Sequence, residues 1–160
     1  MVLSFEQVKV KLASYCAYQE RCSHEVLEKL KAYSLTEDEM IDLMRWLSKE
    51  RYLDDLRFAK EFVHGKFYIK KWGRVKINFE LRKKGIIERF ISRALAEEIN
   101  EEDYRSTAIL LAEKKFVSLG RSLSPQAQKK ILSYLQQKGF EWNIVKECLE
   151  EVIQHEKNRP

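Results

Sequence analysis

The chain has 160 residues, enough for one domain or a row of small modules with a real hydrophobic core. Hydrophobic residues make up 44% of it and charged residues 34%, a composition typical of a folded globular protein. The net charge is +5, and the basic excess lies in residues 51–100, with 13 basic and 7 acidic side chains. A partner that carries phosphates or an acidic protein surface is favoured there.

The first segment, MVLSFEQVKVKLASYC, carries charges at Glu6, Lys9 and Lys11, so it does not resemble the apolar core of a signal peptide. No apolar run approaches the roughly 20 residues that span a bilayer. We therefore expect a cytoplasmic protein with no membrane partner. The cysteines are odd in number and form no C-x-x-C pair, so we expect buried thiols instead of disulfides or zinc ligands; they are Cys16, Cys22 and Cys148.

Helical spacing of apolar residues dominates the chain, which has only two prolines and five glycines to interrupt it. Helix start signals recur at four places. Gln7 and Glu39 each stand three residues after a hydroxyl residue, as in a capping box, and Pro125 fits a first helical turn. The expected N-caps are Ser4, Thr36, Asn100 and Ser124. The sequence predicts an all-α fold.

One helix–turn–helix pattern occurs three times at a near-constant spacing, around Leu30, Leu81 and Leu135. A branched aliphatic residue lies four positions before each leucine. Four positions after each leucine comes a serine or a glycine, at 34, 85 and 139. Such a residue can adopt the left-handed conformation that closes a helix. A further helix with apolar residues precedes each of the three helix–turn–helix segments.

The pattern therefore predicts nine helices in three tandem three-helix repeats. Their boundaries are 1–51, 52–100 and 101–160, the last with a short polar C-terminal tail. Because a unit of about 50 residues is marginal alone, we expect neighbouring repeats to pack into an elongated, curved body.

The stretch 68–86 holds seven basic residues and only one acid, Glu80. Ile77 and Leu81 fall on the apolar side that all three repeats share. Val75 and Phe79 fall on a second side, where the sister helices carry solvent-type residues. Two interpretations remain open: the central repeat packs against neighbours on both sides, or these two residues dock another protein.

Basic residues fill the arcs between the two apolar sides, and an aromatic residue precedes them. Trp72 is either a stacking or anchoring aromatic, or a plug that closes the turn before the helix. We predict that this region forms the partner-binding or DNA-binding surface. Its predicted residues are Lys70, Lys71, Trp72, Arg74, Lys76, Arg82 and Lys83.

No catalytic signature is present in the sequence: no phosphate-binding loop, no dinucleotide-binding glycine pattern and no nucleophile elbow. The paired acids Asp54 and Asp55 are more typical of helix capping than of acid–base chemistry. The three histidines are scattered, which disfavours a metal site. We expect a protein that is not an enzyme and has no cofactor.

Two motifs resemble the RecX family, regulators of the bacterial RecA recombinase. The segment RYLDDLRFA (51–59) is similar to the family's G-Y-[LI]-[DN]-D-x-[RA]-[FY]-A, and residues 73–86 are similar to G-x-x-[RK]-I-x-x-E-L-x-x-K-G-I. The three repeats extend the resemblance over almost the whole chain. The chain departs from the family at Arg51, where glycine is usual, and at Ile87 and Glu141, which do not cap helices well.

The resemblance implies a monomeric regulator that binds the RecA–single-stranded-DNA filament. Such a protein mainly inhibits ATP hydrolysis and strand exchange by RecA in DNA recombination, DNA repair and the SOS response. Two alternatives remain: a helix-turn-helix-like protein that binds single- or double-stranded DNA directly, and a helical adaptor with no nucleic-acid role. The predicted surface residues follow from charge and position, not from the family.

Overall fold

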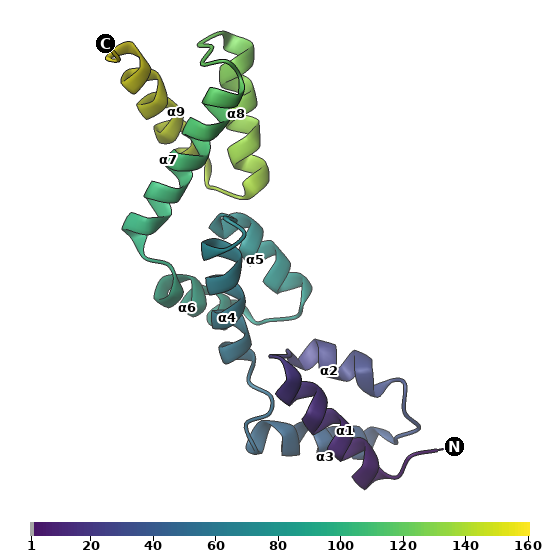
Figure 1. Cartoon of the computed structure of the whole chain (residues 1–160). Helices are drawn as coiled ribbons and strands as arrows, with labels where there is room; N and C mark the ends of the chain where they lie inside the picture. The colour runs from purple at the N-terminus through teal and green to yellow at the C-terminus, as the bar shows by residue number, and fades with distance from the viewer. Residues whose placement is uncertain (1) are drawn as a thin grey trace. The chain divides into compact units, whose positions relative to one another are not determined.

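The computed structural model describes residues 2–160, which form nine α-helices and no strand (Figure 1). The prediction of an all-α fold is therefore confirmed. Within the described residues, no helix combines the length and the apolar character needed to cross a membrane. The helices are α1 (Phe5–Tyr18), α2 (Ser23–Leu30), α3 (Glu37–Lys49), α4 (Asp55–Tyr68), α5 (Arg74–Lys83), α6 (Glu88–Glu98), α7 (Glu101–Ser118), α8 (Pro125–Lys138) and α9 (Trp142–Lys157).

The chain divides into two compact units. The first unit comprises the chain up to Phe62 and the segment Leu81–Ala94, and the second unit comprises Val63–Glu80 and Leu95–Pro160. The division falls inside α4, α5 and α6. The predicted boundaries of the three repeats, like the predicted shape of the whole body, stay a prediction.

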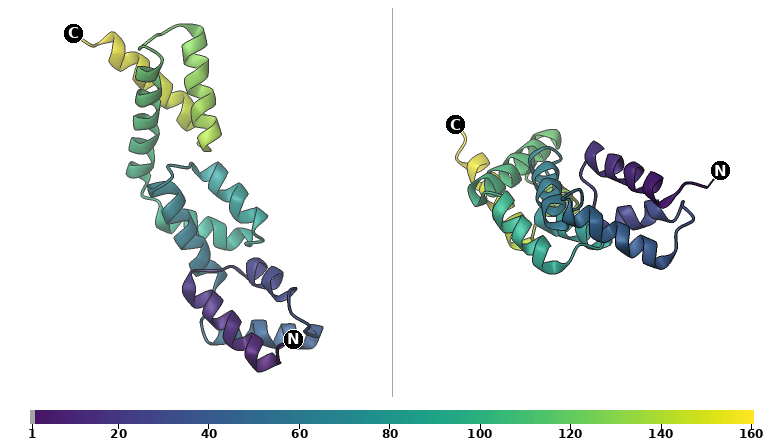
Figure 2. Two further views of the ribbon diagram at one scale, coloured as in Figure 1. Left: turned by 45° about the vertical axis from the view of Figure 1, so that its right-hand side comes forward. Right: turned by 90° about the horizontal axis from the view of Figure 1, so that it is seen from below.

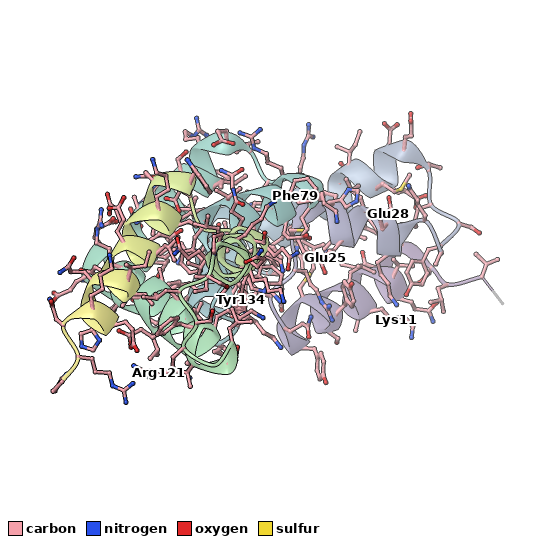
Figure 3. All side chains as sticks on the ribbon, turned by 90° about the horizontal axis from the view of Figure 1, so that it is seen from above. Lys11, Glu25, Glu28, Phe79, Arg121 and Tyr134 are labelled. Atoms are coloured by element: carbon pink, nitrogen blue, oxygen red, sulfur yellow. The ribbon has the colours of Figure 1, made fainter. Side chains whose placement is uncertain are left out.

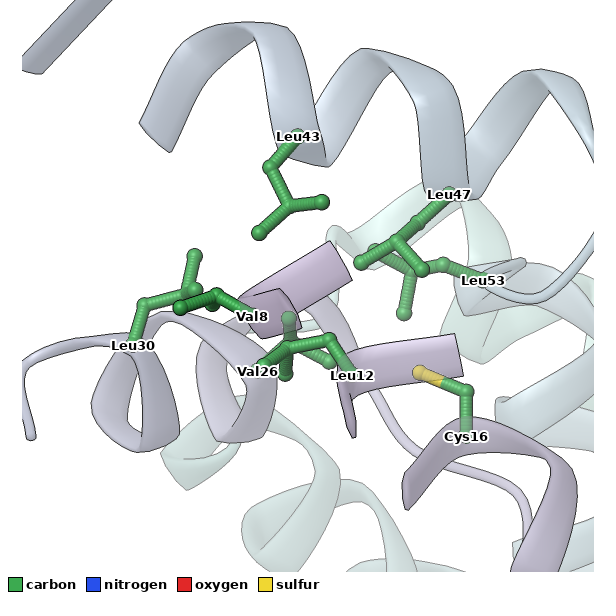
Figure 4. Close-up of a cluster of buried hydrophobic side chains, with 8 residues drawn as sticks. All are labelled: Val8, Leu12, Cys16, Val26, Leu30, Leu43, Leu47 and Leu53. Atoms are coloured by element: carbon green, nitrogen blue, oxygen red, sulfur yellow. The ribbon is translucent and has the colours of Figure 1, made fainter. Parts of the chain in front are cut away.

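The core of the first unit is built from α1, α2 and α3 (Figure 4). On α1 the buried residues are four apart, because that spacing places them on one side of the helix. Apolar residues of α2 and α3 face them, and Leu53 closes the end of the cluster. The cluster contains Val8, Leu12, Cys16, Val26, Leu30, Leu43, Leu47 and Leu53.

The core positions predicted from the repeat are buried. Leu30, Leu81 and Leu135 are all fully inaccessible to solvent. The aliphatic residue four positions earlier is also buried in each helix: Val26, Ile77 and Ile131. The helical register that the repeat predicts is therefore confirmed for α2, α5 and α8.

In the second unit, α7, α8 and α9 pack against one another (Figure 1 and the left view of Figure 2). Small residues on α7 let the neighbouring helices approach closely, since Ala108 and Ala112 are fully buried. Val145 on α9 and Leu135 on α8 are also fully buried. These three helices form the frame that carries the candidate site.

Most of the predicted helix ends are confirmed. The side chains of Ser4, Thr36, Asn100 and Ser124 each accept a hydrogen bond from a backbone N–H in the first helical turn. Gly85 and Gly139 adopt φ values of +77° and +96°, as a left-handed closing residue requires. The prediction fails for Ser34, since its φ is not positive. There the Leu35 N–H bonds to the Tyr33 carbonyl instead, at 3.0 Å.

The two acids after α3 are both caps, but of different helices. The Asp54 carboxylate accepts the N–H of Arg57 at 3.0 Å, at the start of α4. The Asp55 carboxylate accepts the N–H of Ser23 at 2.8 Å, at the start of α2. The capping interpretation of the acid pair is therefore confirmed, and Asp55 also ties α4 to α2 within the first unit.

The three cysteines are buried and free, as predicted. Burial is the main reason that the pKa of Cys22 and the pKa of Cys148 are both raised to about 11. These thiols therefore stay protonated near neutral pH and behave as small apolar side chains.

Arg51 closes α3 in the left-handed conformation, with φ 63°, at the position where the similar motif has glycine. A side chain costs about 1 kcal/mol there, because Cβ crowds the following carbonyl. We expect Arg51→Gly to raise the free energy of unfolding by about 1 kcal/mol. Urea denaturation followed by circular dichroism measures the change. Arg51→Ala is the control, because it removes the side chain and keeps Cβ; a glycine variant no more stable than the alanine variant would refute the prediction.

Candidate partner-binding surface

The turn between α4 and α5 is closed by backbone hydrogen bonds. Lys71 adopts a left-handed conformation, with φ 60°, and its N–H bonds to the Phe67 carbonyl at 3.0 Å. The N–H of Trp72 bonds to the Lys66 carbonyl at 2.9 Å. The Lys71 ammonium donates to the Tyr68 carbonyl at 2.8 Å, near the end of α4, where the helix dipole favours positive charge. Lys70 projects from this turn as an exposed side chain.

Trp72 lies between two ammonium groups. The Nζ atom of Lys76 is 4.3 Å from the centre of its ring, and that of Lys66 is 4.8 Å away. These are cation–π contacts, which hold positive charge next to the half-buried indole. The indole thus lies against two lysine ammonium groups. The stacking and plugging interpretations of Trp72 both remain compatible with this geometry.

A lysine from another part of the sequence joins this turn. The Nζ atom of Lys138, the last residue of α8, donates to the Lys70 carbonyl at 2.9 Å. Burial lowers the pKa of Lys138, and the positive charge of Lys76 lowers it further. The lysines here therefore repel one another, which an anionic partner would relieve. We call this surface the basic turn; it consists of Lys70, Lys71, Trp72, Lys76 and Lys138.

Two glycines bring Lys138 to the turn. The N–H of Gly73 bonds to the Lys138 carbonyl at 2.7 Å, and the N–H of Val75 bonds to the Gly139 carbonyl at 2.9 Å. A Cβ atom on Gly73 would lie only 2.3 Å from the Gly139 oxygen. The backbones can approach this closely only because neither residue has a side chain.

Arg74 differs from the lysines because its charge is neutralised within the protein. Its guanidinium bonds to Glu141 at 2.9 Å and also to Glu101, and it stacks 3.8 Å from the centre of the Tyr104 ring. Burial opposes the charge, but the hydrogen bonds to both carboxylates outweigh burial and raise the pKa of Arg74. The side chain is only 24% exposed. Arg74 therefore joins α5 to α7 and to the start of α9.

Tyr104 is at the centre of this network. It is fully buried, its hydroxyl donates to Glu141, and the same oxygen accepts the N–H of Arg74 at 2.9 Å. Burial and the contact with the Glu141 carboxylate raise the pKa of Tyr104, so the hydroxyl keeps its proton. This hydrogen bond also positions Glu141, which makes no capping bond of its own at the start of α9.

We expect Tyr104→Phe to lower the free energy of unfolding by about 2 kcal/mol, because it removes a buried hydrogen bond to a charged group. Thermal or urea unfolding followed by circular dichroism measures the loss. Tyr68→Phe is the matched control: its hydroxyl donates to Asp103 at 2.8 Å at an exposed site, so we expect a loss under about 1 kcal/mol. Equal losses in the two variants would show that the buried network does not stabilise the second unit.

Arg82 and Lys83 belong to the first unit, unlike the other predicted surface residues. Both are exposed, and Arg82 forms an ion pair with Glu88 at 2.7 Å. The seven-residue surface predicted from the sequence thus contains five residues of the second unit and these two. That all seven act together stays a prediction.

Val75 and Phe79 are 55% and 59% exposed (Phe79 is labelled in Figure 3). More than half of each side chain is therefore accessible on the second side of α5. Sequence reasoning missed Lys66 and Lys138, which lie outside the basic stretch. The only signal for Lys138 was its place immediately before the repeat's closing glycine.

Within residues 2–160, no group of three or more histidine, cysteine, aspartate or glutamate side chains is arranged to hold a metal ion. The charged residues that define the basic turn are four lysines. Their chemistry is suited to holding an anionic surface or a phosphate by charge and hydrogen bonding.

Two family models match the chain. The model described as "RecX, second three-helix domain" matches residues 54–95, and "RecX, third three-helix domain" matches residues 101–149. Four residues of the basic turn fall within the first match, and its fifth residue, Lys138, falls within the second.

Relatives named "Regulatory protein RecX" are similar over most of the chain. The protein of Lactococcus lactis subsp. lactis (strain IL1403) is 31% identical over 91% of this chain and 55% of its own length. That of Bacillus cytotoxicus is 29% identical over 92% and 54%. The chain spans 54 to 62% of the length of the first curated relatives it matches. The crystal structure of RecX from Lactobacillus salivarius has the same fold, with a TM-score of 0.85 at 24% identity over 94% of this chain and 97% of that one.

Proposed function

The chain belongs to the RecX family of regulatory proteins, and from this we propose that it binds the RecA–single-stranded-DNA filament and mainly inhibits RecA. Inhibition covers ATP hydrolysis and strand exchange. The protein acts by binding and catalyses no reaction of its own. This role places it in the cytoplasm, in DNA recombination and repair. The observation that carries the proposal is the match of the family's second and third domain models to the two segments that meet at the basic turn.

The basic turn suits a filament surface that is acidic or carries phosphates. Four lysines gather at this turn, one of them over the Trp72 indole, and the backbone contact between Gly73 and Gly139 holds together the two segments that contribute them. A preorganised cationic surface loses little conformational entropy on binding. Its charge also speeds the encounter with a negatively charged filament. We propose that the exposed side chains of Val75 and Phe79 add an apolar contact beside this charge.

The test is a titration of RecA ATPase activity on single-stranded DNA with increasing amounts of this protein. We expect the hydrolysis rate to fall to a low plateau, and the inhibition to weaken as salt is raised, since exposed charges are screened. ATP hydrolysis should also fall when the protein is added to RecA filaments already assembled on single-stranded DNA, because the proposed target is the filament and not free RecA. An unchanged hydrolysis rate at saturating protein would refute the proposed function.

A further inference from the structure

Helix α7 borders two grooves of nearly equal volume but opposite charge. The groove towards α9 has a volume of about 500 Å³ and is lined by Glu147, Glu150 and Glu151. The groove towards α8 has a volume of about 510 Å³, and its only charged lining residues are three lysines. We call the latter the α7–α8 groove; it lies entirely within the second unit.

The lysines of the α7–α8 groove face no carboxylate. Lys129 and Lys130 are exposed and form no ion pair among the described residues, and Lys115 lies over an aromatic ring instead of an acid. In the groove towards α9, by contrast, the Arg105 guanidinium forms an ion pair with the Glu147 carboxylate at 2.5 Å. The positive charge of the α7–α8 groove is therefore available to a ligand.

The rest of the groove lining is uncharged and polar, apart from one aromatic ring. Tyr134 lies half-buried on α8 (labelled in Figure 3), with the Lys115 Nζ atom 5.3 Å from the centre of its ring. Gln126, Ser133 and Gln137 share its side of α8, since they recur at helical spacing along the groove. A partner protein would need an apolar anchor to bind tightly, and the groove offers none beyond this ring.

Three cations, neutral hydrogen-bonding groups and an aromatic ring together match the chemistry of a single-stranded nucleic acid. Lysines contact the phosphates, amide and hydroxyl groups bond to phosphate or sugar oxygens, and the ring stacks on a base. We propose that the α7–α8 groove binds the sugar–phosphate backbone of single-stranded nucleic acid, with Tyr134 as the stacking surface. This inference goes beyond the proposed function and does not depend on RecA.

The test is fluorescence anisotropy of labelled oligo(dT) with the full chain alone, over a range of salt concentrations. Each contact with a single-stranded phosphate releases about 0.7 counterion. At about 0.1 M salt, we expect Lys129→Glu with Lys130→Glu to weaken binding by at least about 20-fold and to reduce the salt slope by about 1.4. The matched control is Lys146→Glu with Lys157→Glu, which makes the same charge change at exposed positions on α9. We expect at most a 3-fold loss for the control.

A second variant tests the ring. We expect Tyr134→Leu to weaken binding about 10-fold while leaving the salt slope unchanged, because stacking releases no counterion. Its melting temperature, followed by circular dichroism, shows that the fold persists. Comparing the affinities for oligo(U) and oligo(dT) shows whether the groove distinguishes RNA from DNA. Binding of either oligonucleotide that is weakened in the lysine variant supports the proposed site.

Three outcomes would overturn the proposal. One is wild-type protein that does not bind either oligonucleotide. Another is an equal loss in the α7–α8 groove variant and the α9 control, which would show that net charge alone decides binding. The third is poly-glutamate binding in the groove more tightly than the oligonucleotides at the same salt, which would assign the groove to an acidic protein. None of these results bears on inhibition of RecA, so the proposed function is tested separately.

Discussion

Gly73→Ala is expected to lower the free energy of unfolding by about 3 to 5 kcal/mol and the melting temperature by about 10 °C. Its Cβ would lie 2.3 Å from the Gly139 oxygen and 2.5 Å from the Phe140 nitrogen, which are backbone atoms that cannot rotate away. Separating the two turns would also weaken the Gly73–Lys138 and Val75–Gly139 hydrogen bonds. Each is worth about 1 kcal/mol.

Four glycine-to-alanine variants separate crowding from backbone conformation. Gly139→Ala should lose as much as Gly73→Ala and about 1 kcal/mol more, because its φ of +96° adds a conformational cost. Gly120 has a φ of +73° and open space around it, so its alanine variant should lose only about 1 kcal/mol. Gly65 lies inside α4 with nothing within 4 Å of the added atom, and its variant should gain about 1 kcal/mol.

Hydrogen exchange locates the damage. We expect faster exchange of backbone amides in the second unit of Gly73→Ala, while amides of α1 in the first unit keep their protection. Circular dichroism melting curves measure the stabilities of all four variants. If Gly73→Ala melted like Gly65→Ala, the close contact between the two glycine turns would not exist in solution.

Local signals in the sequence predicted most of the fold. Capping boxes act within four residues, so Ser4 and Thr36 could be identified as N-caps without tertiary information. The buried positions of α2, α5 and α8 followed from a spacing that any amphipathic helix obeys. Ser34 was predicted wrongly for the same local reason: the repeat aligned it with two glycines, but the left-handed conformation costs a serine free energy, and the chain turns here without it.

Contacts between distant segments could not be predicted in this way. Glu141 was interpreted only as a poor helix cap, although it and Glu101 both hold Arg74. Lys138 reaches the Lys70 carbonyl across 67 intervening residues, and no local pattern connects them. The φ of Gly73 is outside the left-handed range, so the turn itself does not require glycine there; the close approach of the Gly139 backbone does, and only the structure shows it.

The surface of the second unit also shows where charge counting along the sequence misleads. The repeat identified Lys129 and Ser133 as solvent-type residues at the positions that correspond to Val75 and Phe79. Both are exposed in the structure, as predicted, and both also line the α7–α8 groove. Basic and acidic residues are nearly equal in number in the sequence of the third repeat. In the structure, three lysines line the groove on one side of α7 and three glutamates line the groove on the other side.

The second large effect concerns inhibition of RecA. We expect Lys70→Glu with Lys71→Glu to raise the concentration for half-maximal inhibition of the RecA ATPase at least about 10-fold. Reversing two charges at the basic turn replaces attraction to an anionic surface by repulsion, and a tenfold change corresponds to only about 1.4 kcal/mol. Neither side chain bonds to Arg74, Glu101 or Glu141, so that network stays intact, and the only bond lost is the one from the Lys71 ammonium to the Tyr68 carbonyl. Arg74 itself is a poor test residue, since Arg74→Glu would place a third carboxylate beside Glu101 and Glu141.

The control is again Lys146→Glu with Lys157→Glu on α9, which should inhibit like the wild type. Equal circular dichroism melting curves for the two variants would exclude unfolding as the cause of any difference. Wild-type inhibition by the Lys70 and Lys71 variant would exclude the basic turn as the contact surface and leave the proposed function intact. Testing the Lys129 and Lys130 variant in a parallel titration then shows whether inhibition depends on the basic turn, on the α7–α8 groove or on both. If only the basic turn variant loses inhibition, inhibition depends on the turn and not on the groove; if both lose it, inhibition requires both cationic surfaces.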